Sequence, residues 1–373
     1  MIFSPGDFVY SSSKFLGSYL PPLNIEKLSL LMDSKKINFN DLKKTCNKFK
    51  NIKVHVIGDT IVDSYTRTAF IGGQIKTPTF SVLKQNVDNY LGGAAIVALH
   101  LKKAGADVSF TSVLGNDEFG KFVKKKLLEK KIKTKIITDF NRPTVNKNTI
   151  QTGSYKLLKV DTLDNTPVSD DIIKKICENI KKTKTDIIIL SDFRHGIFNK
   201  KSIPNIIKSI PKRVFKVADS QVASRWGNIL EFKNFDLITP NEREARFSLG
   251  DQDSPIGSLS DSLAKSAKSK YLILKLGDKG IFCKRNIKNK DKPDYFSLDS
   301  YASNVLDAVG AGDALLAYAS LGLKSTNSLE LSSILGSLAA ACECEYDGNV
   351  PISLEKITEK IDNIKKQLNY KDA

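Results

Sequence analysis

The feature of this sequence that most constrains its fold is an alternation, from residue 52 onward, of short apolar runs with segments of helical periodicity. The run at 186–190 is almost entirely apolar, as in strands that a parallel sheet buries on both faces. Helical spacing is clearest at 94–104 and 119–130. This alternation predicts an α/β fold, with an open, mostly parallel sheet and helices on both faces. The other strands are predicted at 54–57, 108–113, 215–218, 236–239 and 271–276.

Two segments, 66–90 and 136–161, break this rhythm because polar and apolar residues alternate in them without helical spacing. We interpret them as short strands that pair into a small sheet outside the main one. A lid over an active site is the functional interpretation, and a hairpin that decorates the surface is the alternative.

Residues 1–50 differ from the rest of the chain and are predicted to form an N-terminal appendage to a main domain of residues 51–370. The appendage contains a serine run at 11–13, an amphipathic stretch at 25–32 and a predicted helix near 40–49.

The composition argues against several classes of function. The formal net charge is +17, but the lysines are spread in pairs over predicted helix faces, and no RNA-binding or zinc-finger motif accompanies them. We therefore expect no nucleic-acid partner. The sequence has no apolar run of about 18 residues and no signal-peptide pattern, which predicts a cytoplasmic protein without a membrane span. The five cysteines include no C-x-x-C pair, so we expect reduced thiols instead of disulfides or a zinc site.

The strongest local signal is the turn Asp307–Asp313, with the sequence D-A-V-G-A-G-D, which leads into an apolar helix. Small residues let a ligand approach the backbone, and the start of a helix presents free N–H groups and a positive dipole end. Such a turn binds phosphate or a developing anion, and the carboxylate of Asp313 can accept a proton from an incoming hydroxyl. Phosphoryl transfer needs both a group that stabilises the developing negative charge and a positioned base. The alternative is an ordinary helix start with an aspartate cap.

Other polar residues and glycines follow predicted strands, which is where ligands bind in open α/β sheets. Asn241 and Glu244 share one face of the helix that follows a strand. They can hold Mg²⁺ through water, or form a capping box instead. Gly92 and Gly93 precede a helix, where they suit close ligand contact or tight packing. The segment 275–280 forms a turn after a buried strand.

Acids and histidines complete the candidate residues. Asp59 and Asp63 flank the end of the first strand, where they can accept hydrogen bonds from sugar hydroxyls or act as caps. His55, His100 and His195 are too scattered for a metal cluster. His55 is predicted to be a core residue, whereas a site role for His195, in a loop after a strand, stays open. The sequence has no Walker A motif and no H-R-D catalytic loop.

The order of these motifs resembles that of the PfkB sugar kinases over about residues 52–365. The matching segments are Gly58–Asp63, Gly92-Gly93, N-x-x-E at 241–244, G-x-x-G at 277–280 and the turn at 307–313. The segments R-P-T-x-x-K at 142–147, L-L-K-V-D at 157–161 and L-S-D-F-x-x-G at 190–196 are most similar to heptose-phosphate kinases. The resemblance implies a ribokinase-like fold with a small β lid. It also implies ATP-dependent phosphorylation of a hydroxyl on a sugar or sugar phosphate, with heptose phosphate favoured.

The resemblance further implies roles for individual residues. Asp313 would be the catalytic base, and the backbone N–H groups of Gly310, Ala311 and Gly312 would form an anion hole. Asp307 would help to hold a monovalent cation. The lid strands would form a homodimer. ATP and Mg²⁺ would contact Asn241, Glu244, Lys275, Gly277 and Gly280, with Glu244 organising the metal. The sugar would contact Asp59, Asp63, Gly92, Gly93, Arg142, Lys147 and Asp192.

Three positions depart from the family pattern. Ile96 stands where Asn is usual, which removes a sugar hydrogen bond and indicates a divergent substrate. Ala308 stands where Thr is common, which weakens the cation assignment, and Lys275 stands where Thr is frequent. Residues 10–20 are similar to the tail of cytidylyltransferase-like domains, which implies the remnant of such a domain or a nucleotidyltransferase partner. The alternative functions are a catalytically silent sugar-binding subunit of a nucleotidyltransferase and a nucleoside kinase.

Overall fold

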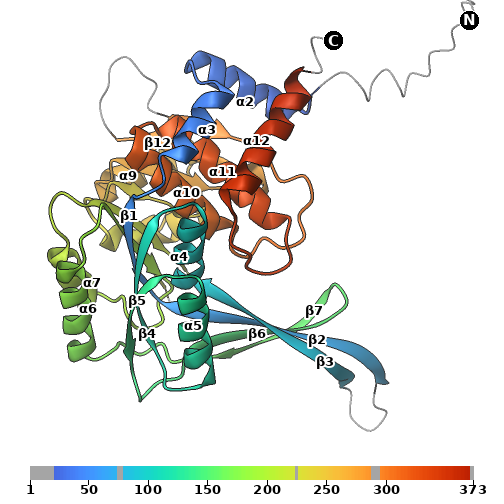
Figure 1. The fold of residues 1–373 in the computed structure, drawn as a ribbon, viewed down its shortest axis with the longest axis vertical. Helices are drawn as coiled ribbons and strands as arrows, with labels where there is room; N and C mark the ends of the chain where they lie inside the picture. The colour runs from blue at the N-terminus through green and yellow to red at the C-terminus, as the bar shows by residue number, and fades with distance from the viewer. Residues whose placement is uncertain (1–20, 74–78, 223–225, 287–294, 370–373) are drawn as a thin grey trace, which may run out of the picture.

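The computed structural model of the protein describes residues 21–73, 79–222, 226–286 and 295–369. Within these ranges, nine strands form one sheet in the order β13-β12-β11-β10-β9-β8-β1-β4-β5 (Figure 1). Neighbouring strands are parallel except where β12 and β13 add antiparallel at one edge. The predicted α/β fold with a mostly parallel sheet is confirmed. The strands are β1 (Lys53–Gly58), β4 (Asp107–Leu114), β5 (Lys133–Thr138), β8 (Ile187–Asp192), β9 (Phe215–Ser220), β10 (Leu237–Ile238), β11 (Tyr271–Lys275), β12 (Ile281–Arg285) and β13 (Tyr295–Leu298).

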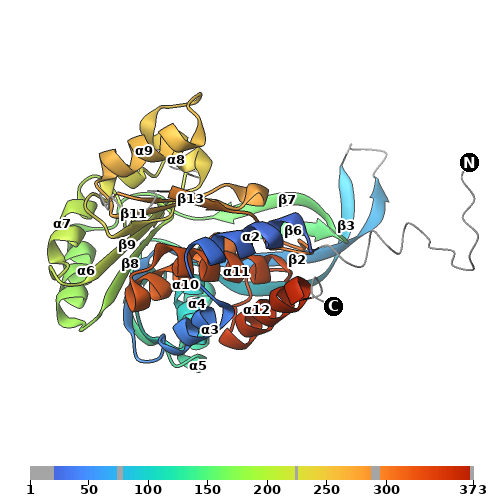
Figure 2. The same ribbon diagram turned by 90° about the horizontal axis from the view of Figure 1, so that it is seen from above.

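The central strands are apolar along their whole length because successive side chains pack alternately into two hydrophobic cores. On β8, Ile187 and Ile189 belong to one hydrophobic cluster, whereas Ile188 and Leu190 belong to the other. Both clusters are covered by helices, so neither face of these strands is polar (Figure 2). The first cluster takes side chains from α4 (Ala94–Lys103), α5 (Glu118–Glu129), α10 (Ala311–Thr326), α11 (Leu329–Cys344) and α12 (Leu354–Asn369). The second takes them from α6 (Asp170–Lys182), α7 (Ser202–Ser209), α8 (Glu242–Leu249) and α9 (Ile256–Ala267).

The described part of the expected appendage packs on the main domain. Two helices, α2 (Leu23–Ser34) and α3 (Phe39–Asn47), place Leu28 and Leu42 in the first core. Phe49, just after α3, meets the ring of Tyr318 edge-on at 6.2 Å. Burying each such side chain contributes about 1.5–3 kcal/mol relative to exposure, which suffices to hold both helices in place. The segment at 10–20 lies outside the described residues.

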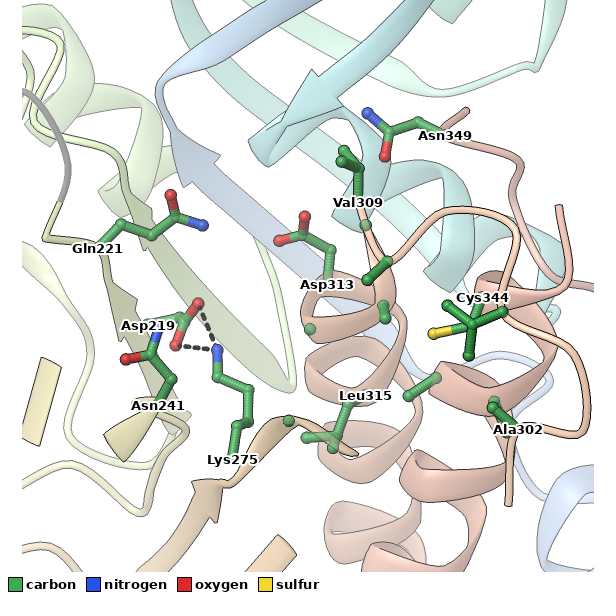
Figure 3. Close-up of a pocket in the computed structure, with 18 of the residues that line it drawn as sticks. Asp219, Gln221, Asn241, Lys275, Ala302, Val309, Asp313, Leu315, Cys344 and Asn349 are labelled. Carbon is green, nitrogen blue, oxygen red and sulfur yellow. Dashed lines mark hydrogen bonds and ion pairs between the residues drawn. The ribbon is translucent and has the colours of Figure 1, made fainter. Parts of the chain in front are cut away.

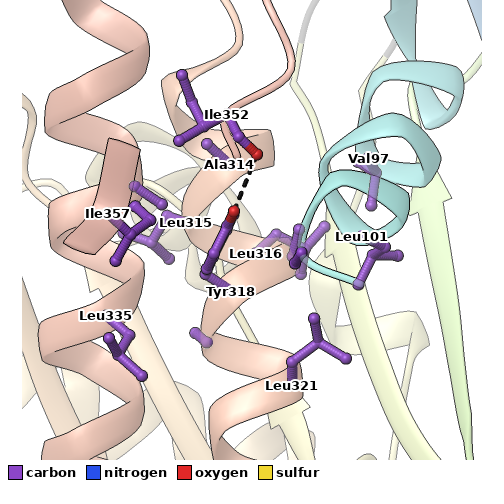
Figure 4. Close-up of a cluster of buried hydrophobic side chains, with 14 of the residues drawn as sticks. Val97, Leu101, Ala314, Leu315, Leu316, Tyr318, Leu321, Leu335, Ile352 and Ile357 are labelled. Carbon is purple, nitrogen blue, oxygen red and sulfur yellow. Dashed lines mark hydrogen bonds between the residues drawn. The ribbon is translucent and has the colours of Figure 1, made fainter. Parts of the chain in front are cut away.

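Tyr318 marks the centre of this core. Its ring is fully buried among leucines and isoleucines of α4, α10, α11 and α12, and its hydroxyl donates a hydrogen bond to the carbonyl of Ile352 over 2.9 Å (Figure 4). This packing fixes α10, and therefore fixes the glycine-rich turn from which α10 begins.

A second, four-stranded sheet projects from the main body in the order β3-β2-β6-β7 (Figure 1). Its strands are β2 (Thr60–Gly73), β3 (Phe80–Gly93), β6 (Val145–Thr152) and β7 (Tyr155–Thr162). The prediction of a separate small sheet is confirmed, but two details were wrong. β2 and β3 have 14 residues each, so they are long. The residues at 136–138 belong to β5, at the edge of the main sheet, where partial exposure produces the same alternation as in a lid strand.

None of the helices in the described ranges is both long enough and apolar enough to cross a membrane.

Candidate active site

A cavity of about 580 Å³ opens at the carboxyl ends of the parallel strands, between the main sheet, the lid and the start of α10. Its walls come from elements far apart in the sequence. β2 contributes Asp63, β6 contributes Lys147, β9 contributes Asp219, and the glycine-rich turn contributes Asp313. Asp219 and Asp313 lie on opposite sides of this space (Figure 3). The structure brings together most of the predicted site residues here: Asp63, Gly93, Lys147, Asn241, Glu244, Lys275, Gly277, Gly280, Gly310, Ala311, Gly312 and Asp313.

The glycine-rich turn places Asp313 in the first turn of α10. Gly310, the N-cap, has a φ of 89°, which is strained for any residue with a side chain, and a Cβ there would collide with the Asn349 side chain. The backbone N–H of Asp313 donates to the carbonyl of Gly310 over 2.9 Å. The 16-residue helix behind the turn directs its positive dipole end toward the cavity. The turn is therefore suited to an anionic group.

Asp313 lies at the centre of an acidic group of side chains. Its residue is 8% exposed, and burial raises the pKa of its carboxyl to about 8, with Asp219, Asp63 and Glu244 adding to the rise. The positive charge of Lys275 lowers the pKa of Asp313. A carboxyl whose pKa lies near the working pH is suited to act as a general base.

Asp219 and Lys275 form an ion pair at the ends of β9 and β11, next to the turn. The ammonium Nζ lies 3.0 and 3.2 Å from the two carboxylate oxygens of Asp219, and the hydroxyl of Thr239 donates to one of these oxygens over 3.0 Å. Sequence reasoning missed Asp219. The available signal was its position, because it directly follows the apolar run at 215–218 on a predicted parallel strand.

Asn241 and Glu244 form a capping box at the start of α8, which is the structural alternative that the sequence left open. Asn241 accepts from the backbone of Glu244 over 2.8 Å, and Glu244 accepts from the backbone of Asn241 over 2.7 Å. Both side chains also line the cavity. Burial raises the pKa of Glu244 to about 7, with Lys275 opposing and Asp219 adding to the rise. Capping of α8 and contact with a ligand in the cavity are compatible roles for Glu244, because a carboxylate can accept more than one hydrogen bond.

The lid side of the cavity carries a second carboxylate between lysines. Burial raises the pKa of Asp63 to about 6, against the opposing effects of Lys147, Lys159 and a hydrogen bond from Asn349. Gly92 leaves room for the Asp63 carboxylate, because a Cβ at position 92 would collide with it. Sequence reasoning missed Lys159 and Asn349, which lie in a lid strand and in a loop after α11.

Four of the predicted sugar contacts, Asp59, Gly92, Arg142 and Asp192, do not line the cavity. Three of them instead hold one loop. Asp59 accepts backbone N–H groups of Phe193 and His195 over 3.1 and 3.2 Å. Arg142 donates to Asp139 and to the carbonyl of His195, over 3.0 and 3.1 Å. Asp192 is fully buried and accepts from Ser220 over 2.7 Å. Their buried hydrogen bonds shape the loop at 193–197, from which Phe193 reaches the cavity wall.

Four other positions also lie off the cavity wall. Asp307 accepts from the hydroxyl of Tyr65 over 2.9 Å, and the ammonium of Lys156 lies 3.4 Å from its other oxygen. Ile96 is fully buried in the first core, so the departure from the family pattern there exposes no side chain to a ligand. His195 contacts Asn165 over 2.6 Å through Nδ1. His55 is a buried core residue, as predicted, bonded to Thr111 over 2.8 Å.

A model of the pfkB family carbohydrate kinases matches residues 51–356 of the chain. The chain belongs to the pfkB family of carbohydrate kinases. The resemblance seen in the order of the sequence motifs is thereby confirmed, and the protein is a carbohydrate kinase.

Two bifunctional proteins are similar in sequence to this pfkB kinase. The Bifunctional protein HldE of Campylobacter fetus subsp. fetus (strain 82-40) is 31% identical over 297 residues, which cover 78% of this chain and 62% of that protein. The Bifunctional protein HldE of Sulfurimonas denitrificans (strain ATCC 33889 / DSM 1251) is 26% identical over 319 residues, which cover 82% of this chain and 64% of that protein. The chain therefore spans less than two thirds of the length of these relatives.

Solved structures show the fold of the pfkB kinase. Phosphofructokinase-2 from Escherichia coli in complex with fructose-6-phosphate aligns with a TM-score of 0.68 at 16% identity, covering 85% of this chain and 99% of that one. Arabidopsis thaliana ribokinase complexed with ribose and ATP aligns with a TM-score of 0.65 at 18% identity, covering 83% and 99%. The predicted ribokinase-like fold is confirmed.

Proposed function

We propose that this pfkB kinase transfers the γ-phosphoryl group of ATP to a hydroxyl of a sugar phosphate, with a heptose phosphate favoured and Asp313 as the base. The observation that carries the proposal is the division of the cavity into two chemically different parts. One part, near α10 and α11, is lined by small apolar side chains and suits a nucleotide base: Ala302, Val305, Leu315, Ala340 and Cys344. The other, below the lid, is lined by Asp63, Lys147 and Lys159.

The two lid lysines support a phosphorylated sugar over a neutral one. Lys147 on β6 and Lys159 on β7 lie on paired strands, and within the described residues neither forms an ion pair within 4 Å. Burial lowers the pKa of Lys147, which means that its ammonium is partly stripped of water. An unpaired, partly desolvated cation is costly unless a ligand supplies the countercharge. The phosphate of the acceptor would do so, and Asp63 would accept its hydroxyls.

The acidic group around Asp313 supports the use of Mg²⁺ with the nucleotide. Asp219, Glu244 and Asp63 would repel a triphosphate, so a divalent cation bridging the phosphates would offset that repulsion. Across the described ranges, no three His, Cys, Asp or Glu side chains gather into a metal site. Asn241 and Glu244, which line the cavity, would hold such an ion through water, as hard oxygen ligands do.

The monovalent cation expected at Asp307 does not fit the residues there. Tyr65 and Lys156 already occupy the two oxygens of Asp307, and Ala308 has no hydroxyl to offer. We therefore assign no step of the reaction to such a cation.

Two proposals concern partners. The lid exposes Ile71, Phe80 and Tyr155 at 66%, 80% and 76%, and we propose that a second copy of the chain covers them in a homodimer. Because residues 10–20 are similar in sequence to the tail of cytidylyltransferase-like domains, we also propose a nucleotidyltransferase partner and a cytoplasmic location.

The experiment that tests the function is an ATP-consumption screen over heptose, hexose and pentose phosphates, the corresponding free sugars, and nucleosides. We expect the highest kcat/KM with a sugar phosphate, and with the heptose phosphate among these. Higher kcat/KM with free sugars or nucleosides would contradict the proposed substrate class. Tight sugar binding without any turnover would favour the silent sugar-binding subunit.

A further inference from the structure

Lys275 presents its ammonium to the glycine-rich turn. It is the last residue of β11, and its side chain is 15% exposed on the cavity wall. A Cβ built on Gly312 would lie 3.3 Å from its Nζ, so the ammonium stands directly beside the backbone of the turn. Figure 3 shows Lys275 and Asp313 converging on the same space from opposite sides.

Three neighbouring strands hold this ammonium in position. The backbone N–H of Lys275, at the end of β11, donates to the carbonyl of Pro240, just after β10, over 2.9 Å. Asp219, at the end of β9, accepts the ammonium through both of its oxygens, and Thr239 fixes one of these oxygens. The ion pair is thus built on the rigid sheet, where a functional group is held more accurately than on a loop.

The surroundings keep Lys275 charged. Burial alone lowers the pKa of its ammonium, but Asp219 and Glu244 raise it more, and the net shift is upward. Lys275 therefore remains a cation at neutral pH. Asp313 also lies close enough to contribute to this shift.

An ion pair in this place needs an explanation beyond stability. Taking two charges out of water costs about as much as their attraction returns, so a buried pair is weak evidence for a stabilising role. A cation poised beside a helix start and a general base has a direct chemical use, because phosphoryl transfer is accelerated by positive groups aimed at the transferring phosphoryl oxygens.

We propose that Lys275 is a catalytic residue that donates N–H groups to the oxygens of the transferring phosphoryl group, and that Asp219 is the residue that positions it. This inference rests on the proposed function. In the step, the acceptor hydroxyl oxygen forms a bond to the γ-phosphorus, and the bond from that phosphorus to the β,γ-bridging oxygen breaks. The hydroxyl proton passes to the carboxylate of Asp313. Lys275 stays protonated throughout and faces the phosphoryl oxygens from beside the glycine-rich turn.

The test compares Lys275→Met with the double variant Lys275→Met/Asp219→Asn, which removes both charges and so protects folding. The exposed Lys279→Met, four residues along the same turn, is the matched control. We expect kcat to fall about 10²–10³-fold in both Lys275 variants, as for the loss of one transition-state donor. The KM for the sugar should change less than about threefold in these variants, because a contact made only in the transition state lowers kcat without weakening substrate binding.

A second readout is independent of turnover. ADP with aluminium fluoride mimics the transferring phosphoryl group, and its affinity, measured by calorimetry relative to that of ADP alone, should fall in both Lys275 variants and stay unchanged in Lys279→Met. Wild-type kcat together with wild-type aluminium fluoride affinity in the folded variants would overturn the inference. If the wild-type protein turns over no sugar at all, the proposed function fails, and the aluminium fluoride affinities still decide the role of Lys275.

Discussion

Asn349 donates a hydrogen bond from its Nδ2 to Oδ2 of Asp63 over 2.6 Å, joining the loop after α11 to the lid strand β2. The other atom of the same amide, Oδ1, lies where a side chain on Gly310 would collide with it. One buried side chain therefore touches both the residue that we assign to sugar binding and the turn that carries the base. This contact couples the two halves of the cavity.

Replacing Asn349 by Leu should weaken sugar binding in a pH-dependent way. The lost hydrogen bond stabilises the ionised form of Asp63, so the pKa of that carboxyl should rise above its present value of about 6. More of the protein then carries a protonated Asp63 at pH 6, and the KM for the sugar should rise about tenfold there, consistent with the loss of a hydrogen bond to a charged group. At pH 8 the increase should be smaller. Steady-state kinetics at the two pH values measure it, and an equal KM increase at both would contradict the coupling.

Replacing Asp313 by Asn should lower kcat by about 10²-fold or more, since general base catalysis contributes roughly 10²–10⁴-fold. In the wild-type protein the base must be ionised, so kcat/KM should rise with pH toward a plateau above the pKa of about 8. The variant should lose this rise, while its KM for the sugar barely changes. Asp253→Asn, an exposed site between α8 and α9, is the control. Turnover that survives in Asp313→Asn would contradict the mechanism.

Replacing Lys147 or Lys159 by Met should discriminate between phosphorylated and free sugars. Each change removes a cation from the lid side of the cavity, so the KM for a sugar phosphate should rise about tenfold or more, as for a charge-assisted contact. The KM for the corresponding free sugar should stay within about threefold of wild type, because a free sugar has no phosphate for the lysine to contact. Lys84→Met, on the exposed part of β3, is the control. Equal effects on both substrates would show that the lysines do not bind phosphate.

Replacing Gly92 by Ala should displace Asp63. The added Cβ meets the Asp63 carboxylate and lies 3.2 Å from the Asn349 amide, so the carboxylate must move. We expect the KM for the sugar to rise about tenfold or more and the KM for ATP to stay close to wild type. Gly257→Ala in α9, where nothing lies within 4 Å of the new Cβ, should leave kinetics unchanged and stabilise the helix slightly. A Gly92→Ala protein with unchanged sugar KM would refute this account of Gly92.

Much of the site was predictable because its signals are local. The turn that ends in Asp313 combines small residues and a helix start within a few residues, and the N-x-x-E segment at 241–244 combines a strand end, capping residues and a helix start. Parallel strands place their carboxyl ends at one edge of the sheet, so the position of the N-x-x-E segment beside other strand ends follows from the fold class. The lid was also predicted, although β5 was partly assigned to it.

Side-chain direction was not predictable at the same strand ends. Asp59, Arg142 and Asp192 lie close in sequence to cavity residues, yet their side chains turn into hydrogen bonds with the loop at 193–197 and with Ser220. Sequence position tells which loop a residue belongs to, whereas the direction of its side chain depends on which buried polar groups need a partner.

The strand and helix alternation and the glycine-rich turn follow from local sequence, because hydrophobic periodicity and backbone conformational preferences act over a few residues. The partners of the charged groups depend on how the chain folds. Asn349 meets Asp63 across 286 positions, and Lys275 meets Asp219 across 56. Burial raises the pKa of Asp313, and the distant acids Asp219 and Asp63 add to that rise. Electrostatic interactions depend on distance in space and on exclusion of water, and the folded chain sets both.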